Sequence, residues 1–140
     1  MTTATFQARL EDLAAVGSFI EKAIRPAGLN ETTAYAIQLA VDEACSNIIE
    51  HAYQNQGGKI LCTCEVNPEA VTIILQDWGK PFTPTQINPP DYRKTATRNN
   101  FRGLGLFFIY RMMDEVKFET PPEGGNILTM VKLTKRERAD

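Results

Sequence analysis

The sequence has a single histidine, three cysteines and no apolar run near the ~20 residues that a membrane-spanning helix needs. Its first residues show no basic start followed by an apolar stretch, so no leader is expected. The cysteines lack the Cys-x-x-Cys spacing of redox and zinc sites, and His51 has no Cys or His partner at ligand spacing. We therefore expect a soluble, cytoplasmic protein with buried, reduced cysteines and a structural histidine.

An excess of basic residues is also missing. The net charge is -2, whereas binding to a nucleic-acid backbone usually needs a concentrated basic surface. No Ser-His-Asp or Cys-His triad is indicated. The length of 140 residues predicts one domain over residues 1–140.

Hydrophobic periodicity and turn residues predict helices and strands that are segregated along the chain. The expected order is a strand over 3–10, a helix over 11–24, a long helix capped by Asn30 and closed by Gly57-Gly58, strands over 59–66 and 70–76, a helix over 104–113, and strands over 115–119 and 126–133. This order predicts an α+β two-layer sandwich. We expect a mixed, mostly antiparallel sheet with helices on one face.

Residues 80–102 contain four of the eight prolines and show no apolar periodicity. A loop of this length in a small domain is typically a lid or a binding loop. Lys80, Arg98 and Arg102 flank it or lie in it, and each could neutralise phosphate charge. The alternative is that all three are solvated surface charges.

Glu43 and Asn47 stand four residues apart on the long predicted helix, so both lie on one face. A carboxylate and a carboxamide in this arrangement can share a hard cation such as Mg²⁺ and its waters. Glu43 could also accept a proton from an incoming hydroxyl. The alternative is a pair of ordinary solvated side chains.

Asp77 ends an apolar strand and precedes Trp78 and Gly79. A carboxylate held there can accept a hydrogen bond from the exocyclic amine of adenine, and Gly79 permits a close approach. The alternative is a simple Asp-x-Gly turn.

The run Gly103-Leu104-Gly105-Leu106 follows the long loop and enters the next helix. Backbone N–H groups at the start of a helix favour anions. The run is neither a Walker A sequence nor the dinucleotide fingerprint, so a glycine hinge without a ligand is an equal alternative.

Together these motifs resemble the anti-sigma-factor serine kinases. That family belongs to the Bergerat-type ATPase superfamily, which also contains gyrase, heat-shock chaperones and histidine kinases. The similarity covers nearly the whole chain and rests on residues 41–53 (VDEACSNIIEHAY), 77–82 (DWGKPF), 102–109 (RGLGLFFI), 113–116 (MDEV) and 125–132 (GNILTMVK).

The resemblance implies a single histidine-kinase-like ATPase domain with the Bergerat fold, and ATP and Mg²⁺ as its ligands. Glu43 would be the general base and Asn47 the magnesium ligand. Asp77 would bind the adenine amine, with Gly79 beside it.

The resemblance also places the phosphates and the lid. Residues 80–102 would form the ATP lid, and an arginine before the glycines, Arg102 or Arg98, would serve phosphoryl transfer. The cofactor would lie against Gly103, Leu104, Gly105 and Leu106.

The family phosphorylates a serine on a STAS-domain antagonist and sequesters a sigma factor when that antagonist is unavailable. Many members are homodimers, and neither nucleic acid nor a membrane is a direct partner. Two departures concern this chain: the family often has Asp at the position of Thr83 and Thr at the position of Asn126.

The leading hypothesis is an ATP-dependent serine kinase, and Glu43 favours it because a protein that only binds has less use for a base. The rival is an ATP-gated binding protein without productive transfer. A fragment of a sensor kinase is a third option, but the chain lacks a phosphoacceptor-helix domain.

Overall fold

The computed structural model describes residues 1–81 and 101–134, and in residues 101–105 it describes the backbone alone. The main elements in chain order are β1 (Thr2–Gln7), α1 (Leu13–Ile24), α2 (Glu31–Asn47), β2 (Lys59–Val66), β3 (Ala70–Asp77), α4 (Phe101–Met112), β4 (Glu115–Glu119) and β5 (Asn126–Leu133). Single 3-10 turns, Leu10–Asp12 and Arg25–Ala27, flank α1. A π-helical turn, Ile48–Ala52, continues α2.

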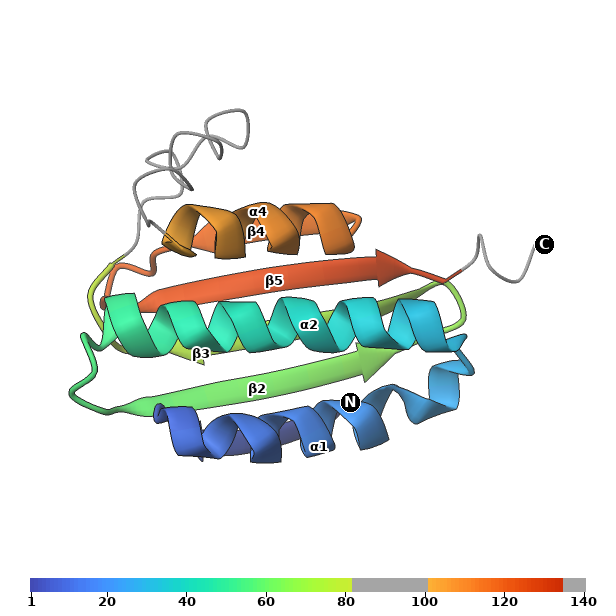
Figure 1. The fold of residues 1–140 in the computed structure, drawn as a ribbon, viewed down its shortest axis with the longest axis horizontal. Coiled ribbons are helices and arrows are strands. Elements are labelled where there is room, and N and C mark those ends of the chain that lie inside the picture. Colours follow the sequence, from blue (N-terminus) through green and yellow to red (C-terminus); the bar gives the residue numbers. More distant parts are fainter. Residues whose placement is uncertain (82–100, 135–140) are drawn as a thin grey trace.

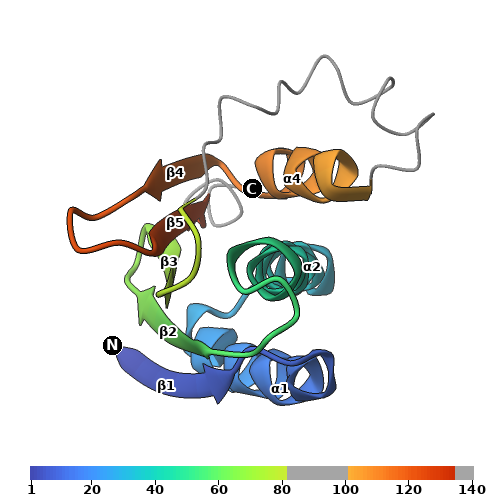
Figure 2. The same cartoon turned by 90° about the vertical axis from the view of Figure 1, so that its left-hand side faces the viewer.

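The five strands form one sheet in the order β1-β2-β3-β5-β4, and every strand pair in the described residues is antiparallel. Figure 2 shows the sheet as one layer and α1, α2 and α4 as a second layer on one of its faces. The predicted α+β two-layer sandwich is therefore confirmed, with a wholly antiparallel sheet in place of the expected mixed one. Hairpins join β2 to β3 and β4 to β5, and two helices return the chain between β1 and β2. In each of these three connections the second strand therefore runs opposite to the first.

Strands β2 and β3 alternate between the helix-covered face and the open face of the sheet. Cys62, Cys64, Ile73 and Leu75 all lie on the covered face and are at most 2% exposed. The three cysteines are buried and free, as predicted. Burial raises the pKa of the Cys62 thiol to about 12, so it stays protonated and packs as a small apolar side chain.

Helix α2 lies between α1 and α4 over the middle of the sheet (Figure 2). Asn30 caps it as predicted, because its Oδ1 accepts a hydrogen bond of 2.8 Å from the backbone N–H of Thr33. The apolar stripe of this helix is buried along its whole length; its members are Ile37, Val41, Ala44, Cys45, Ile48 and Ala52. Burial of this stripe fixes which face of α2 is left for polar side chains.

Three predicted boundaries are wrong. The first strand ends at Gln7 and the first helix begins at Leu13, because a 3-10 turn occupies the residues between. Helix α4 includes Phe101, so Gly103 lies inside its first turn and does not open it. A helical glycine costs only about 1 kcal/mol relative to alanine, less than burial of Leu106 and its neighbours contributes.

The spacing of apolar residues predicts that one side of this helix faces the core, with Leu106, Phe107, Ile109, Tyr110 and Met113 inward. Leu106, Ile109 and Met113 are buried and Phe107 is half-buried, but Tyr110 is 38% exposed and contacts Phe118 of β4.

Four chain segments that are distant in sequence meet at one end of the molecule. Figure 1 shows the last turn of α2, the end of β3, the beginning of β5 and the first turn of α4 at the same end. The antiparallel register places Asp77 opposite Asn126 there. This end of the two-layer sandwich contains the polar residues considered next.

Candidate functional site

Asp77 is the last residue of β3 and faces the helices, where it is 2% exposed. Its Oδ1 accepts hydrogen bonds from the backbone N–H of Gly79 at 2.9 Å and from the Asn126 amide at 3.0 Å. Burial raises the pKa of Asp77, and these two hydrogen bonds oppose the rise because they favour the carboxylate. Since both bonds go to Oδ1, Oδ2 is the oxygen available to a ligand's donor.

Gly79 brings the end of β3 against the π turn. A β-carbon at this position would overlap the carbonyl oxygen of Ala52. The next backbone N–H, that of Lys80, donates to the same oxygen at 2.7 Å. Glycine alone permits this approach, so the segment that carries Asp77 is docked directly onto the end of the helix that carries Asn47.

Tyr53 supports the same segment from the other side. Its hydroxyl donates to the carbonyl of Lys59 at 2.6 Å and accepts from the backbone N–H of Trp78 at 2.8 Å. The Lys59 ammonium lies 4.6 Å from the centre of the Trp78 ring. These contacts connect the start of β2 to the end of β3, and sequence reasoning did not indicate them.

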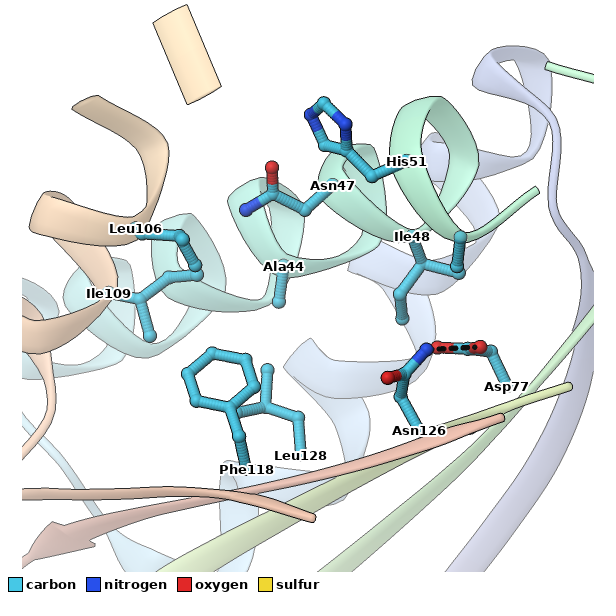
Figure 3. A pocket seen from close by; sticks show the side chains of 11 residues that line it. Ala44, Asn47, Ile48, His51, Asp77, Leu106, Ile109, Phe118, Asn126 and Leu128 are labelled. Atoms are coloured by element: carbon cyan, nitrogen blue, oxygen red, sulfur yellow. Dashed lines mark hydrogen bonds between the residues drawn. The ribbon is translucent and has the colours of Figure 1, made fainter. Parts of the chain in front are cut away.

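A pocket opens between the end of α2, helix α4 and the sheet (Figure 3). Its walls are mainly apolar, and its polar groups come from α2 with the π turn and from the ends of β3 and β5. The lining residues are Ala44, Asn47, Ile48, His51, Ala52, Asp77, Leu106, Ile109, Phe118, Asn126 and Leu128. An apolar slot with a carboxylate at one side suits a flat heteroaromatic ring that carries an amino group.

Asn47 and His51 are separated by one turn and both line this pocket. The Asn47 Nδ2 atom is buried, and no group in the described part of the chain accepts a hydrogen bond from it. Such an orphaned amide costs free energy until a ligand satisfies it, and turning the amide over would present its oxygen instead. Asn47 therefore fits the role of a ligand to a cation bound beside a nucleotide phosphate. The position of His51 in the pocket was not expected from the sequence.

Glu43 lies one turn before Asn47 on α2 and is partly buried. Burial raises its pKa, and the neighbouring charges of Asp42 and Glu50 raise it further. It is not among the described residues that line the pocket. A partly desolvated carboxylate of raised pKa is nevertheless the form that suits a general base near neutral pH.

The predicted phosphate-binding run, Gly103 to Leu106, occupies the first half of α4. Leu106 is 2% exposed and lines the pocket, which brings this helix to the same site. Of Arg102, Gly103, Leu104 and Gly105 only the backbone is described. The predicted lid, with Arg98, lies largely in residues 82–100, outside the described residues.

No helix among the described residues is long and apolar enough to cross a membrane. No group of three or more His, Cys, Asp or Glu side chains there is arranged to hold a metal ion.

Residues 6–132 match the family described as histidine kinase-like ATPase domain. The serine-protein kinase RsbW of Halalkalibacterium halodurans is 33% identical over 108 residues, which cover 74% of this chain and 65% of that protein. RsbW of Bacillus licheniformis is 30% identical over 110 residues, 74% of this chain and 67% of that protein. The chain thus spans about two thirds of the length of these relatives.

Among solved structures, the SiaB–SiaC complex from Pseudomonas aeruginosa aligns with a TM-score of 0.58 and 12% identity. The alignment covers 93% of this chain and 88% of that chain, and at this identity it shows the fold alone. The fold, the family match and the relatives agree with the family that the sequence resembles. The chain belongs to the histidine kinase-like ATPase domain family, and the serine-protein kinases RsbW are among its relatives.

Proposed function

We propose that residues 1–140 form one ATP-dependent serine protein kinase domain that phosphorylates a STAS-domain antagonist in the cytoplasm. In this proposal the same domain binds a sigma factor, or an equivalent partner, when the antagonist is phosphorylated. Relatives named serine-protein kinase RsbW support the class of reaction. The substrate and partner follow from the family resemblance.

The observation that carries this proposal is the shared pocket of Asp77 and Asn47, which are 30 positions apart in sequence. Adenine would lie between the apolar walls, and its 6-amino group would donate to Asp77 Oδ2. The triphosphate would then extend along the end of α2 toward Asn47. When bound there, Mg²⁺ would neutralise phosphate charge.

The protein's own groups would perform the remaining steps. Glu43, as the general base, would take the proton of the incoming serine hydroxyl. Backbone N–H groups in the first turn of α4, that of Gly103 among them, would face the phosphates. Arg102 would stabilise the charge that develops on the transferred phosphoryl group.

A second function is favoured by one observation: Glu43 is not among the described residues that line the pocket. A protein that binds ATP and changes its partner affinity without transferring phosphate needs Asp77 and Asn47 but no base. Such an ATP-gated regulator would occupy the same pocket.

One transfer assay distinguishes the two functions. The protein is mixed with Mg-ATP labelled in the γ-phosphate and with the STAS-domain protein encoded nearest to its gene. The kinase proposal expects label on a serine of the STAS protein, and a serine-to-alanine variant of that protein is the control. Binding of ATP with no phosphoserine under any condition would leave the ATP-gated regulator as the function.

Replacing Asp77 with Asn is expected to weaken ATP binding by about 1–3 kcal/mol, because the buried amide meets the adenine amine with a weaker acceptor or a competing donor. Isothermal titration calorimetry with Mg-ATP measures the change. Glu65→Gln, an exposed carboxylate on β2, is the matched control and should leave the affinity unchanged. Equal ATP affinity in Asp77→Asn and wild type would count against adenine at this position.

A further inference from the structure

Asn126, the first residue of β5, is 8% exposed and lines the pocket. Its side-chain nitrogen donates to Asp77 Oδ1 at 3.0 Å and to the backbone carbonyl of Lys80 at 2.9 Å. One amide therefore connects the beginning of β5 to both ends of the segment 77–80. Figure 3 shows the bond between Asn126 and Asp77 at the floor of the pocket.

The same segment is confined from two other directions. Gly125, with φ +79°, allows no β-carbon, because that carbon would overlap the carbonyl oxygen of Asp77. Gly79 is docked on the π turn, and its N–H is the second donor to Asp77 Oδ1. The backbone of residues 77–80 is thus held by contacts of its own. Among the described side chains, that of Asn126 is the one that binds the Asp77 carboxylate.

We propose that Asn126 is a positioning residue for nucleotide recognition, which holds the Asp77 carboxylate by Oδ1 so that Oδ2 is presented to the adenine amine. This inference rests on the proposed ATP function and adds a residue to it. The family often has threonine at this position, whose hydroxyl has one proton to donate. The amide of Asn126 has two, and here it uses both, one for the carboxylate and one for the carbonyl of Lys80.

The charge of Asp77 depends on this contact. Asp77 and His51 are the titratable side chains among the described residues that line the pocket. Two lysines lie close to the segment 77–80, Lys59 against the Trp78 ring and Lys80 at its end, and neither binds the carboxylate. Burial raises the pKa of Asp77, whereas the Asn126 amide lowers it. Removing that donor should raise the pKa of Asp77 further. On acidification Asp77 would then become protonated at a higher pH than in wild type.

The test compares wild type with Asn126→Leu, which keeps the approximate size and removes the donor, and with Asn126→Thr, which restores one proton. Mg-ATP affinity is measured by calorimetry between about pH 8 and about pH 5. We expect Asn126→Leu to bind ATP about tenfold more weakly at neutral pH, and to lose affinity at a higher pH than wild type does. Asn126→Thr should recover part of both changes.

Asn67 provides a matched control at the other end of β3. Its side-chain oxygen accepts hydrogen bonds from the backbone N–H groups of Glu69 and Ala70, at 2.8 and 2.9 Å, and closes the turn between β2 and β3. Asn67→Ala should lower stability to a similar extent. It should leave the ATP affinity and its pH profile unchanged, because it does not touch the pocket.

A second measurement requires no nucleotide. The pKa of the Asp77 carboxyl group can be followed by NMR through its carboxyl carbon. This pKa should be higher in Asn126→Leu than in wild type and unchanged in Asn67→Ala. If Asn126→Leu matches the Asn67 control in the NMR titration and in the ATP profile, the positioning role is overturned while the ATP function stands. If wild type fails to bind ATP at all, the proposed function is overturned, and the role of Asn126 in nucleotide recognition with it.

Discussion

Replacing Glu43 with Gln is expected to lower the rate of serine phosphorylation by about a hundredfold to ten-thousandfold, the usual contribution of general base catalysis. ATP affinity should stay within about tenfold of wild type, because in the proposed site Asp77 would bind the adenine and Asn47 would hold the cation. Single-turnover transfer from labelled ATP, together with calorimetry, separates the two quantities. Equal transfer rates in the variant and wild type would refute the assigned role.

The pH dependence of transfer adds a second signature of Glu43. Its pKa is raised, first by burial and then by the charges of Asp42 and Glu50. A base must be deprotonated, so the wild-type rate should fall on acidification at a higher pH than an ordinary glutamate would give. Glu50→Gln is the matched control: it removes an exposed carboxylate seven residues further along, in the π turn, so transfer should persist and the fall should move to lower pH.

Gly79→Ala is expected to have the largest effect on stability, a loss of about 3 kcal/mol or more of unfolding free energy. The new β-carbon would overlap the backbone carbonyl of Ala52, a group that cannot move aside without losing its hydrogen bond to Lys80. ATP affinity should fall as well, because the segment that carries Asp77 is displaced. Urea unfolding and calorimetry measure the two effects.

Gly17→Ala is the control for this substitution. Gly17 lies inside α1, and no atom lies within 4 Å of a β-carbon built there. Alanine should therefore stabilise the protein by up to about 1 kcal/mol through its helix propensity. A Gly79→Ala protein as stable as wild type would show that the end of β3 is not docked on the π turn as described.

Sequence reasoning recovered most of the fold because local patterns there agree with the packing. Residues 59–66 alternate in burial as a strand with one covered face, and the Asn67 turn joins it to β3. Asn30 is a capping residue whose role depends only on the following turn. Helix boundaries failed where packing outweighs propensity, as in α4, which runs through Gly103.

The candidate site also has parts that could be predicted from the sequence and parts that could not. The pair Glu43 and Asn47 could be placed on one helix face from their spacing, and the order of motifs joined them to Asp77. Neither Asn126 nor His51 was assigned a place in the pocket. The bond between Asn126 and Asp77 spans 49 positions, and the position of His51 depends on the π turn that follows Asn47. Neither the pairing nor the π turn has a periodic signal in the sequence.

The sequence by itself determined the fold class of this protein, since periodicity, capping residues and the order of helices and strands are properties of neighbouring residues and of their spacing. Tertiary structure alone decided how the pocket is built. It decided that Gly79 rests on the carbonyl of Ala52 and that Asn126 binds one oxygen of Asp77, which leaves the other oxygen for a ligand. The physical reason is that these contacts join groups far apart in the chain, whose distance is set only when the sheet and helices close on one core.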